Sequence, residues 1–174
     1  MFPSHDPCLI NGVTPTTVGT WNVPGGSLSQ ITDGTEATDN GYRFRANNTD
    51  SGLVYDIGSS VPVDRFSIHI ATDSAFQPGA YVKDIYVYGS TDNFVASDDL
   101  LGSSLNNDNT TAGAGDTVVI DTGNTTNYQY VKYVFVGDET VNDVVRISEC
   151  YVYTRAPATT NNTADSEELV PTRS

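Results

Sequence analysis

The sequence predicts an all-β protein, an antiparallel jelly-roll β-sandwich of about eight strands. Thr, Ser, Asn, Asp and Gly are abundant while charged residues make up only 17% of the chain, a composition typical of strands and turns. Apolar and polar residues alternate with a period of two in short runs, and no segment carries a helical apolar stripe. The 174 residues suit one domain with a sizeable core.

The expected strands are rich in β-branched and aromatic residues, and Gly, Asn, Asp or Pro bound them. In the run at 80–90, Val82, Ile85 and Val87 do not fall on one face, which predicts a β-bulge or burial on both sides. The principal strands are expected in the runs at 51–58, 63–71, 80–90, 116–123, 128–137 and 144–154.

The stretch from Ser90 to Asp116 is too long for a hairpin turn. We expect part of it to cross the sandwich irregularly and the Asn-, Thr- and Gly-rich part to form a surface loop. The apolar side chains expected to touch the core from this crossing are Phe94, Leu100, Leu101 and Leu105.

Three segments are expected: an N-terminal extension at 1–7, the sandwich at 8–154, and an acidic tail or linker at 155–174, where periodicity disappears. The N-terminus lacks the basic start and apolar run of a signal peptide, and no window approaches a membrane span. We expect either a removed leader or release without one, as for a virus-particle component. The expected location is extracellular, on a cell surface or on a virion surface.

The net charge of −14 and the pI near 4.1 argue against nucleic acid and anionic membranes as partners. An acidic surface does suit divalent cations, and it also serves solubility. No nucleophile elbow, zinc-protease motif or phosphate-binding glycine loop occurs, so we expect no enzyme. A glycosidase-type carboxylate pair is the alternative that sequence spacing leaves open.

The two cysteines, Cys8 and Cys150, lie near opposite ends of the expected domain and form no metal-type cluster. A disulfide between them would fasten the two ends together. Two separate buried thiols are the alternative.

The order of features resembles a known family. An opening cysteine is followed by ITDGTEAT, LVYDIG, VDRFSIHI, VKDIYVYGSTDNF, YQYVKYVFVG and VVRISECYVY. This order is similar to the discoidin family, also called the coagulation-factor C-type or galactose-binding-like domain, which includes fucose-binding lectins and bacterial carbohydrate-binding modules. The resemblance implies an eight-stranded jelly roll, a disulfide between Cys8 and Cys150, and a calcium site that joins the Asp-Gly loop to the acidic residue of the last strand.

The implied calcium site suits the chemistry of Ca²⁺, which prefers carboxylate, carbonyl and hydroxyl oxygens. Asp33 and Glu149 would supply carboxylates from nearly opposite ends of the chain. A hydrogen-bonded Asp-Gly turn with Glu149 on the surface is the alternative. By position, the resemblance adds the carbonyls of Gln30, Thr35 and Ser148, and the carbonyl and hydroxyl of Thr38.

Sugar recognition requires an aromatic platform and planar polar groups on loops at one end of a sandwich. The candidates are Tyr42, Arg43 and Arg45 after the proposed calcium loop, and Phe76, Gln77 and Tyr81 in the next loop. Phe76 could instead cap the core. The histidine with two arginines of fucose-binding members is not reproduced, since His69 is expected to be a half-buried strand residue, so galactose or fucose specificity is not carried over.

The sequence therefore predicts a non-catalytic, calcium-stabilised carbohydrate-binding module that mediates attachment to surface glycans. The alternative is a structural or decorating protein of a virion or surface that uses the jelly roll for protein contacts. The expected partner is a glycan or a protein, with possible self-association or virion assembly, and without direct membrane insertion.

Overall fold

The computed structural model describes residues 8–19, 26–35, 42–45, 51–70, 82–105, 117–137 and 144–154. In this part of the chain no helix has the length and hydrophobicity that a membrane crossing requires. The elements are β1 (Thr16–Val18), the 3₁₀ helix η1 (Leu28–Thr32), β2 (Tyr42–Arg45), β3 (Gly52–Ile70), β4 (Val82–Ser90), β5 (Asp99–Ser104), β6 (Thr117–Asp121), β7 (Asn127–Gly137) and β8 (Val144–Thr154).

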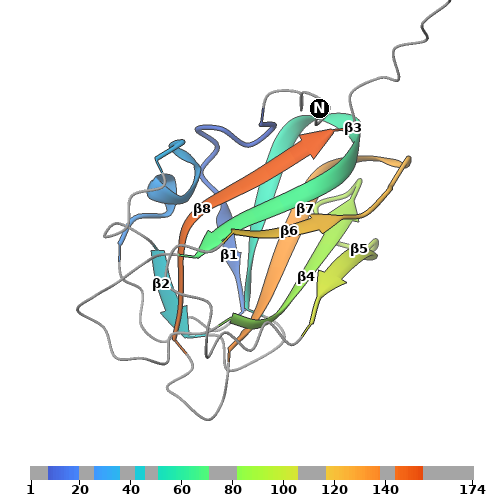
Figure 1. The fold of residues 1–174 in the computed structure, drawn as a ribbon. Helices are drawn as coiled ribbons and strands as arrows, with labels where there is room; N and C mark the ends of the chain where they lie inside the picture. The colour runs from blue at the N-terminus through green and yellow to red at the C-terminus, as the bar shows by residue number, and fades with distance from the viewer. Residues whose placement is uncertain are drawn as a thin grey trace, which may run out of the picture.

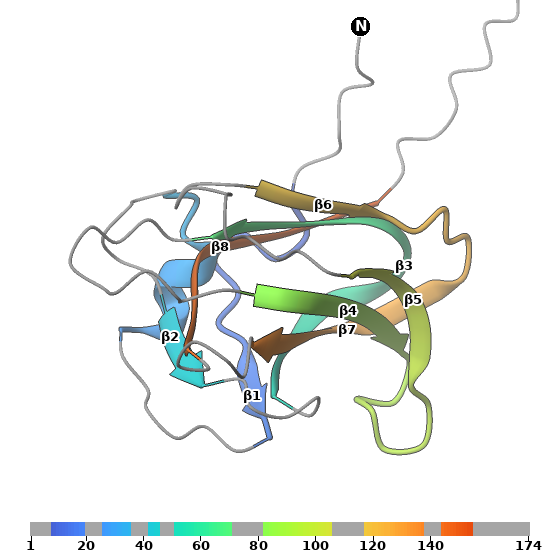
Figure 2. The same ribbon diagram turned by 60° about the horizontal axis from the view of Figure 1, so that its bottom comes forward.

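The strands form two layers, and every strand pair is antiparallel (Figures 1 and 2). The first sheet contains β1, the N-terminal half of β3, β7, β4 and β5. The second sheet contains β6, the C-terminal half of β3, β8 and β2. The predicted antiparallel β-sandwich is confirmed.

A single long strand, β3, belongs to both sheets. Two separate strands were expected at 51–58 and 63–71, but the backbone continues from one to the other through a bend. Gly58, with φ +76°, lies within the register shift between Asp56 and Val61, and glycine adopts this left-handed conformation at little cost. The first half of β3 pairs with β7, and the second half pairs with β8 and β6.

The bulge expected in β4 is confirmed, because the pairing with β7 shifts between Val82 and Asp84. The irregular crossing expected after Ser90 is wrong in part, since β5 pairs antiparallel with β4 as a hairpin that contains one register shift.

Of the apolar residues expected to touch the core from this segment, Leu101 does so. Leu100 and Leu105 are 57% and 54% exposed, and that prediction is wrong. Leu100 lies opposite Tyr88 in the hairpin, and Tyr88 is itself partly exposed. Phe94 is half-buried and lies over Lys132.

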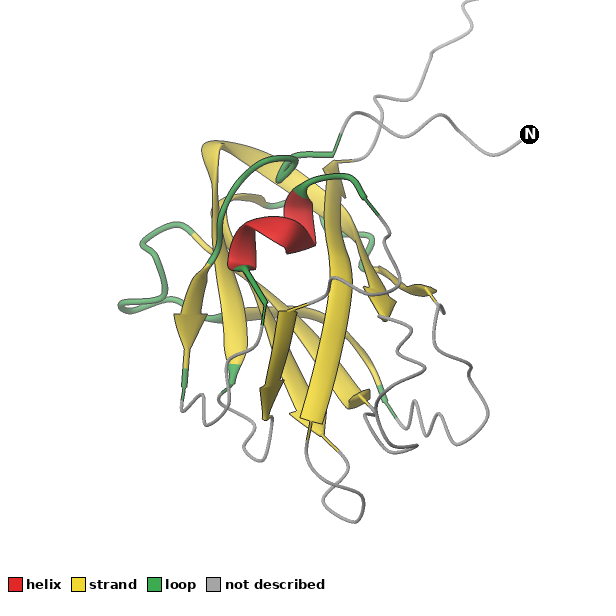
Figure 3. Cartoon of the chain, turned by 90° about the vertical axis from the view of Figure 1, so that its left-hand side faces the viewer, coloured by secondary structure: helices red, strands yellow, loops and turns green. Residues whose placement is uncertain are grey.

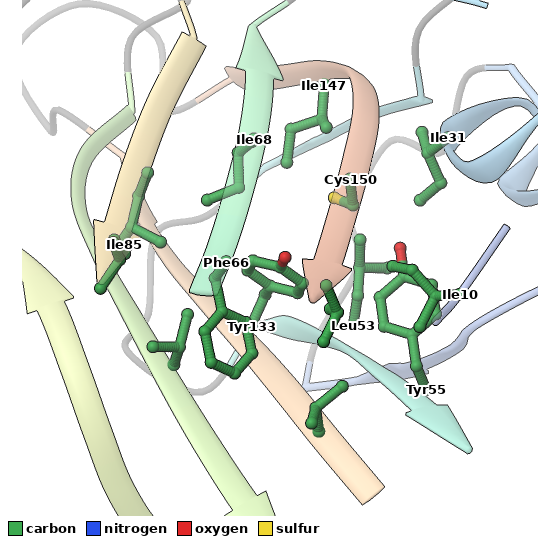
Figure 4. Close-up of a cluster of buried hydrophobic side chains, with 14 of the residues drawn as sticks. Ile10, Ile31, Leu53, Tyr55, Phe66, Ile68, Ile85, Tyr133, Ile147 and Cys150 are labelled. Carbon is green, nitrogen blue, oxygen red and sulfur yellow. The ribbon is translucent and has the colours of Figure 1, made fainter. Parts of the chain in front are cut away.

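The core fills the space between the two sheets, and aromatic rings occupy its centre (Figure 4). The ring of Tyr133 meets Phe66 edge to face at 5.5 Å and lies parallel to Phe135 at 5.8 Å. Its hydroxyl donates to the carbonyl of Tyr151 at 2.6 Å, so the polar end of this fully buried ring is satisfied. Each such ring contributes about 1.5–3 kcal/mol through burial.

The two ends of the folded region lie side by side, as expected, but no disulfide joins them. Both Cys8 and Cys150 are free thiols, so the predicted disulfide is wrong for this structure. The ends are instead joined through the backbone, since the N–H of Leu9 donates to the carbonyl of Val152 at 2.8 Å. Burial in the core raises the pKa of the Cys150 thiol well above its ordinary value, so this thiol is unreactive in the folded chain.

Candidate functional site

The candidate site begins with η1, which covers one end of the sandwich beside β8 (Figure 3). The N–H of Ser27 donates to Oε1 of Gln30 at 2.9 Å and closes the first turn. The buried Thr32 donates from Oγ1 to the carbonyl of Val13 at 2.8 Å. These contacts fix the end of η1 at the point where the Asp-Gly turn starts.

The turn itself is a tight local structure. Asp33 ends η1, and its Oδ1 accepts a hydrogen bond from the N–H of Thr35 at 2.8 Å. Gly34 has φ +78°, a left-handed conformation that residues with a Cβ adopt only at a cost. The Asp-Gly dipeptide is therefore required by the backbone geometry, as its turn chemistry predicted.

Glu149 connects this turn to the last strand. Its side chain is 1% exposed, and its Oε1 accepts a hydrogen bond from the N–H of Gly34 at 3.1 Å. The alternative of Glu149 as a surface residue is wrong. A buried carboxylate is costly unless charged or hydrogen-bonding groups surround it. The hydrogen bond to Gly34 therefore stabilises the Glu149 side chain and also attaches the turn to β8.

Ser148, the residue before Glu149, is the extra residue of a bulge in β8. The register between β3 and β8 shifts between His69 and Ile70. Ser148 is fully buried there, and its Oγ donates to the carbonyl of His69 at 3.2 Å. The hydroxyl of Ser148 is thus committed to β3, and only its carbonyl remains a candidate calcium ligand.

The predicted calcium ligands can be compared with this geometry. The structure brings the Asp33–Thr35 turn together with Glu149 and therefore with Ser148, while Gln30 lies on η1 just before the turn. Thr38 lies outside the described residues. The donors are all oxygens, which fits the chemistry of Ca²⁺.

Among the described residues, no three His, Cys, Asp or Glu side chains are grouped so that they could hold a metal ion. A calcium site here would therefore combine the two carboxylates of Asp33 and Glu149 with backbone carbonyls, as Ca²⁺ sites commonly do.

The predicted sugar-contacting residues divide into two groups. Tyr42, Arg43 and Arg45 lie on β2, which pairs with β8 so that Tyr42 is opposite Ile147, two positions before Glu149. This places β2 directly beside the Glu149 strand. The second group, Phe76, Gln77 and Tyr81, lies outside the described residues.

His69 is a buried residue of β3 that contacts the neighbouring strand β6. It is 8% exposed, and its Nδ1 lies 3.0 Å from Oγ1 of Thr117. The expectation of a strand histidine is confirmed, but the residue is buried rather than half-buried. Sequence reasoning missed the bond between Thr32 and Val13 that anchors η1. The three-residue strand and short 3₁₀ helix in this region carry too little periodicity to predict that contact.

A second polar cluster lies at the turn between β4 and β5. Nζ of Lys132 is 4.7 Å from the ring centre of Tyr88 and 4.5 Å from that of Phe94, and it pairs with Asp98 at 2.8 Å. Burial, followed by the charge of Asp98, raises the pKa of Tyr88. Ser90, where this turn starts, pairs with Tyr130, which pairs with Asp56 beside the bend of β3. Glu149 lies opposite His69, near the C-terminal end of β3 and away from that bend, so the two clusters occupy opposite ends of the sandwich.

The turn that carries Phe94 is held by the carboxylate of Asp92. This carboxylate accepts hydrogen bonds from Oγ of Ser90 at 2.7 Å, from the N–H of Ala96 at 2.9 Å and from Oγ of Ser97 at 2.9 Å. Phe94 has φ +61°, which is uncommon for a bulky residue. The Asp92 network therefore holds a backbone conformation that Phe94 does not favour.

Comparison with known proteins reveals solved structures of the same fold. No protein-family model matches the chain, and no curated protein matches its sequence. A mutant of the lectin binding domain of Lectinolysin complexed with Lewis b has a TM-score of 0.63 at 12% identity, with 88% of this chain and 100% of that chain covered.

Two binding modules match similarly well. Chitosan-binding module 1 of a chitosanase/glucanase from Paenibacillus sp. IK-5 has a TM-score of 0.60 at 18% identity, with coverage of 86% and 100%. The module GH31 CBM32-2 bound to GalNAc has a TM-score of 0.59 at 14% identity, with coverage of 82% and 99%. At these identities the matches establish the fold: the chain has the jelly-roll β-sandwich of these carbohydrate-binding modules, and the predicted similarity in fold is confirmed.

Proposed function

We propose that this chain is a non-catalytic module that binds a surface glycan through the end of the sandwich where Glu149 meets the Asp33–Gly34 turn. The contact between Glu149 and Gly34 carries the proposal, because it converts a loop into a fixed part of the sheet scaffold. Fixed loops on a rigid sandwich provide the preorganisation that ligand recognition requires. Solved structures of the same fold, named as sugar-bound modules, support the choice of ligand class.

The sugar would contact groups next to this fixed turn. β2 carries Tyr42, Arg43 and Arg45 in register with the start of β8, and these residue types supply an aromatic face and guanidinium donors. An aromatic ring packs against the C–H face of a sugar, and planar donors select its hydroxyls. The proposal keeps Phe76, Gln77 and Tyr81 as further contacts and specifies no particular sugar.

Calcium is the proposed resident ion of the turn. Asp33 and Glu149 would hold it with their carboxylates, together with carbonyls of Gln30, Thr35, Thr38 and Ser148. Bound there, the ion supplies charge neutralisation and rigidity rather than chemistry on the sugar. The chain's own contribution is to orient the turn and to keep Glu149 out of water.

This function places the protein where glycans are displayed, namely outside the cell, on a cell surface or on a virion surface. The same fold could instead serve a structural or decorating role through protein contacts, which is our second candidate. The edge strand β6, which among the described residues pairs with β3 alone, is the observation that favours that candidate.

The proposal is tested with a glycan array probed with the full chain in calcium and again after chelation. We expect binding in calcium that weakens at least ten-fold with chelator. Tyr42→Ala and Arg43→Ala should each lose binding, while Leu100→Ala, an exposed residue of β5, is the matched control that should retain it. Binding that chelator leaves unchanged would support glycan binding and would reject the proposed role of calcium. A blank array in both conditions would reject glycan binding and favour the structural role.

A further inference from the structure

The two sheets have four edge strands among the described residues: β1 and β5 in the first sheet, and β2 and β6 in the second. An edge strand exposes backbone donors and acceptors that another strand can pair with. Natural proteins protect such edges with short strands, charged side chains, proline or bulges. The presence or absence of these devices therefore indicates which edge is available for pairing.

Three of the four edges carry a protective feature. β1 has only three residues. β2 carries Arg43 and Arg45 within four residues. β5 begins with the charged Asp99, and its register with β4 shifts between Val87 and Tyr88.

The remaining edge, β6, is the least protected, since its one charged residue, Asp121, stands at its C-terminal end and no bulge interrupts its pairing. Its five residues are TVVID, without lysine, arginine or proline. It pairs with β3 in one unbroken register from Arg65–Asp121 to His69–Thr117. Within the described residues, β3 is the only strand that pairs with β6, which leaves a regular second edge.

The side chains of β6 also favour an apolar partner. Ile120 is buried in the core and Val118 packs against it, whereas Val119 is 50% exposed on the opposite face. The single charge, on Asp121, already pairs with Arg65, whose Nη2 donates to Oδ2 at 3.0 Å. An incoming strand therefore meets an exposed valine and a carboxylate with a neighbouring counter-ion.

We propose that β6 pairs antiparallel with β6 of a second copy of this chain, around a two-fold axis at Val119. In this register Val119 faces Val119 of the second copy, and Thr117 faces Asp121. The two Asp121 carboxylates lie at opposite ends of the short ladder, each across from a threonine hydroxyl. The register is thus self-complementary, as an isologous interface requires, and it places no two like charges face to face.

The pairing joins the second sheets of two molecules into one continuous sheet. A five-residue ladder contributes much less area than the roughly 800 Å² per partner of a stable interface, so the dimer is weak and concentration-dependent. One consequence rests on the proposed glycan function. Thr117 lies opposite His69, at the Glu149 end of β3, so antiparallel pairing points the two candidate binding ends in opposite directions and allows one dimer to bridge two surfaces.

The test is sedimentation equilibrium of the full chain up to about 1 mM, a range that detects weak association. We expect a monomer–dimer equilibrium, and Val119→Lys should raise the dissociation constant more than ten-fold by placing two cations face to face. Leu100→Lys is the matched control, because it adds the same charge at a similarly exposed residue of the β5 edge, and it should leave the constant unchanged. Circular dichroism melts of both variants establish that they fold.

Cross-linking tests the register independently. Under mild oxidation Val119→Cys should form a covalent dimer, whereas the parent chain, which retains Cys8 and Cys150, should not. A monomer at all concentrations, equal weakening by both lysine variants, or no cross-linking of Val119→Cys above the parent would overturn the proposal. None of these readouts involves calcium or sugar, so their failure is distinguishable from failure of the glycan proposal.

Discussion

Oε1 of Glu149 accepts a hydrogen bond from the backbone N–H of Gly34 at 3.1 Å, across 115 positions of the sequence. Through this bond a buried carboxylate of the last strand fixes an exposed turn near the start of the domain. The proposed calcium ion and the proposed binding loops both depend on this relationship.

Calcium should raise the thermal stability of the chain, and Glu149→Gln should remove that response. The substitution keeps the size of the side chain and removes one of the two proposed carboxylate ligands. Calcium at about one hundred times its dissociation constant stabilises a protein by about 2.7 kcal/mol, which a melting curve with and without chelator detects. Asp98→Asn removes an exposed carboxylate at the opposite end and should respond like the parent. An equal calcium response in Glu149→Gln would contradict the assignment of this ligand.

Gly34→Ala should lower the free energy of unfolding by about 1 kcal/mol, because a residue with a Cβ is strained in the left-handed region. The φ of Gly34 is +78°, and an added Cβ would have only Oδ1 of Asn11 as a neighbour, at 3.9 Å. The cost is therefore backbone strain without a clash. Urea unfolding measures it, and an unchanged midpoint would show that the turn adapts without strain.

Gly52→Ala should be far more damaging than Gly34→Ala. A Cβ at Gly52 would overlap the carbonyl oxygen of Tyr133, a backbone atom of the paired strand. Since the backbone of β7 cannot move without disturbing the sheet, we expect a loss of about 3 kcal/mol or more. The same urea experiment compares the two variants, and similar losses at both positions would contradict the close approach of β3 and β7.

Acid should loosen the turn between β4 and β5. Hydrogen bonds, chiefly from Ser90 and then from Ser97 and Ala96, lower the pKa of Asp92 to about 2 from its ordinary 3.8. A lowered folded-state pKa means that the stabilisation is complete above about pH 4 and is lost as the pH falls towards 2. Backbone NMR shifts of residues 90–97 should therefore titrate in this window. Asp92→Asn should abolish that titration, and a titration that persists in this variant would assign it to another group.

The two thiols should differ in reactivity. Cys150 is fully buried, and burial raises the pKa of its thiol, whereas Cys8 is partly exposed. A thiol reagent should label one cysteine per native chain and both in denaturant. Labelling of neither cysteine in denaturant without reductant would reveal a disulfide and contradict the free-thiol state.

The sequence predicted the fold well because its strands alternate strongly. The runs that became β4, β7 and β8 carry β-branched and aromatic residues that fit a pleated, half-buried surface. The strand β5 was not predicted, because Leu100 and Leu101 are followed by Gly102, Ser103 and Ser104. Small and polar residues of this kind are typical of loops. Glycine at position 102 avoids a close contact with β6, since an added Cβ would lie 2.9 Å from Cγ2 of Ile120.

The candidate site was predictable only in part. The Asp-Gly turn is visible in the sequence because its turn chemistry is local. The burial of Glu149 and its contact with Gly34 depend on how distant strands pack, and the resemblance, rather than any spacing, pointed to that pair. The free thiols were not predictable, because the same two cysteines are compatible with a bond or with burial in the core.

The most direct test of the central proposal is an NMR titration of the isotopically labelled chain, in calcium, with N-acetylgalactosamine, fucose and chitosan oligosaccharides. Our account predicts that the sugar bound best shifts the backbone signals of residues 33–35, 42–45 and 147–149 together, with residues 90–98 at the other end unchanged. Shifts confined to residues 90–98, or no shifts with any of these sugars at saturating concentration, would contradict the proposal that the Glu149 end binds glycans.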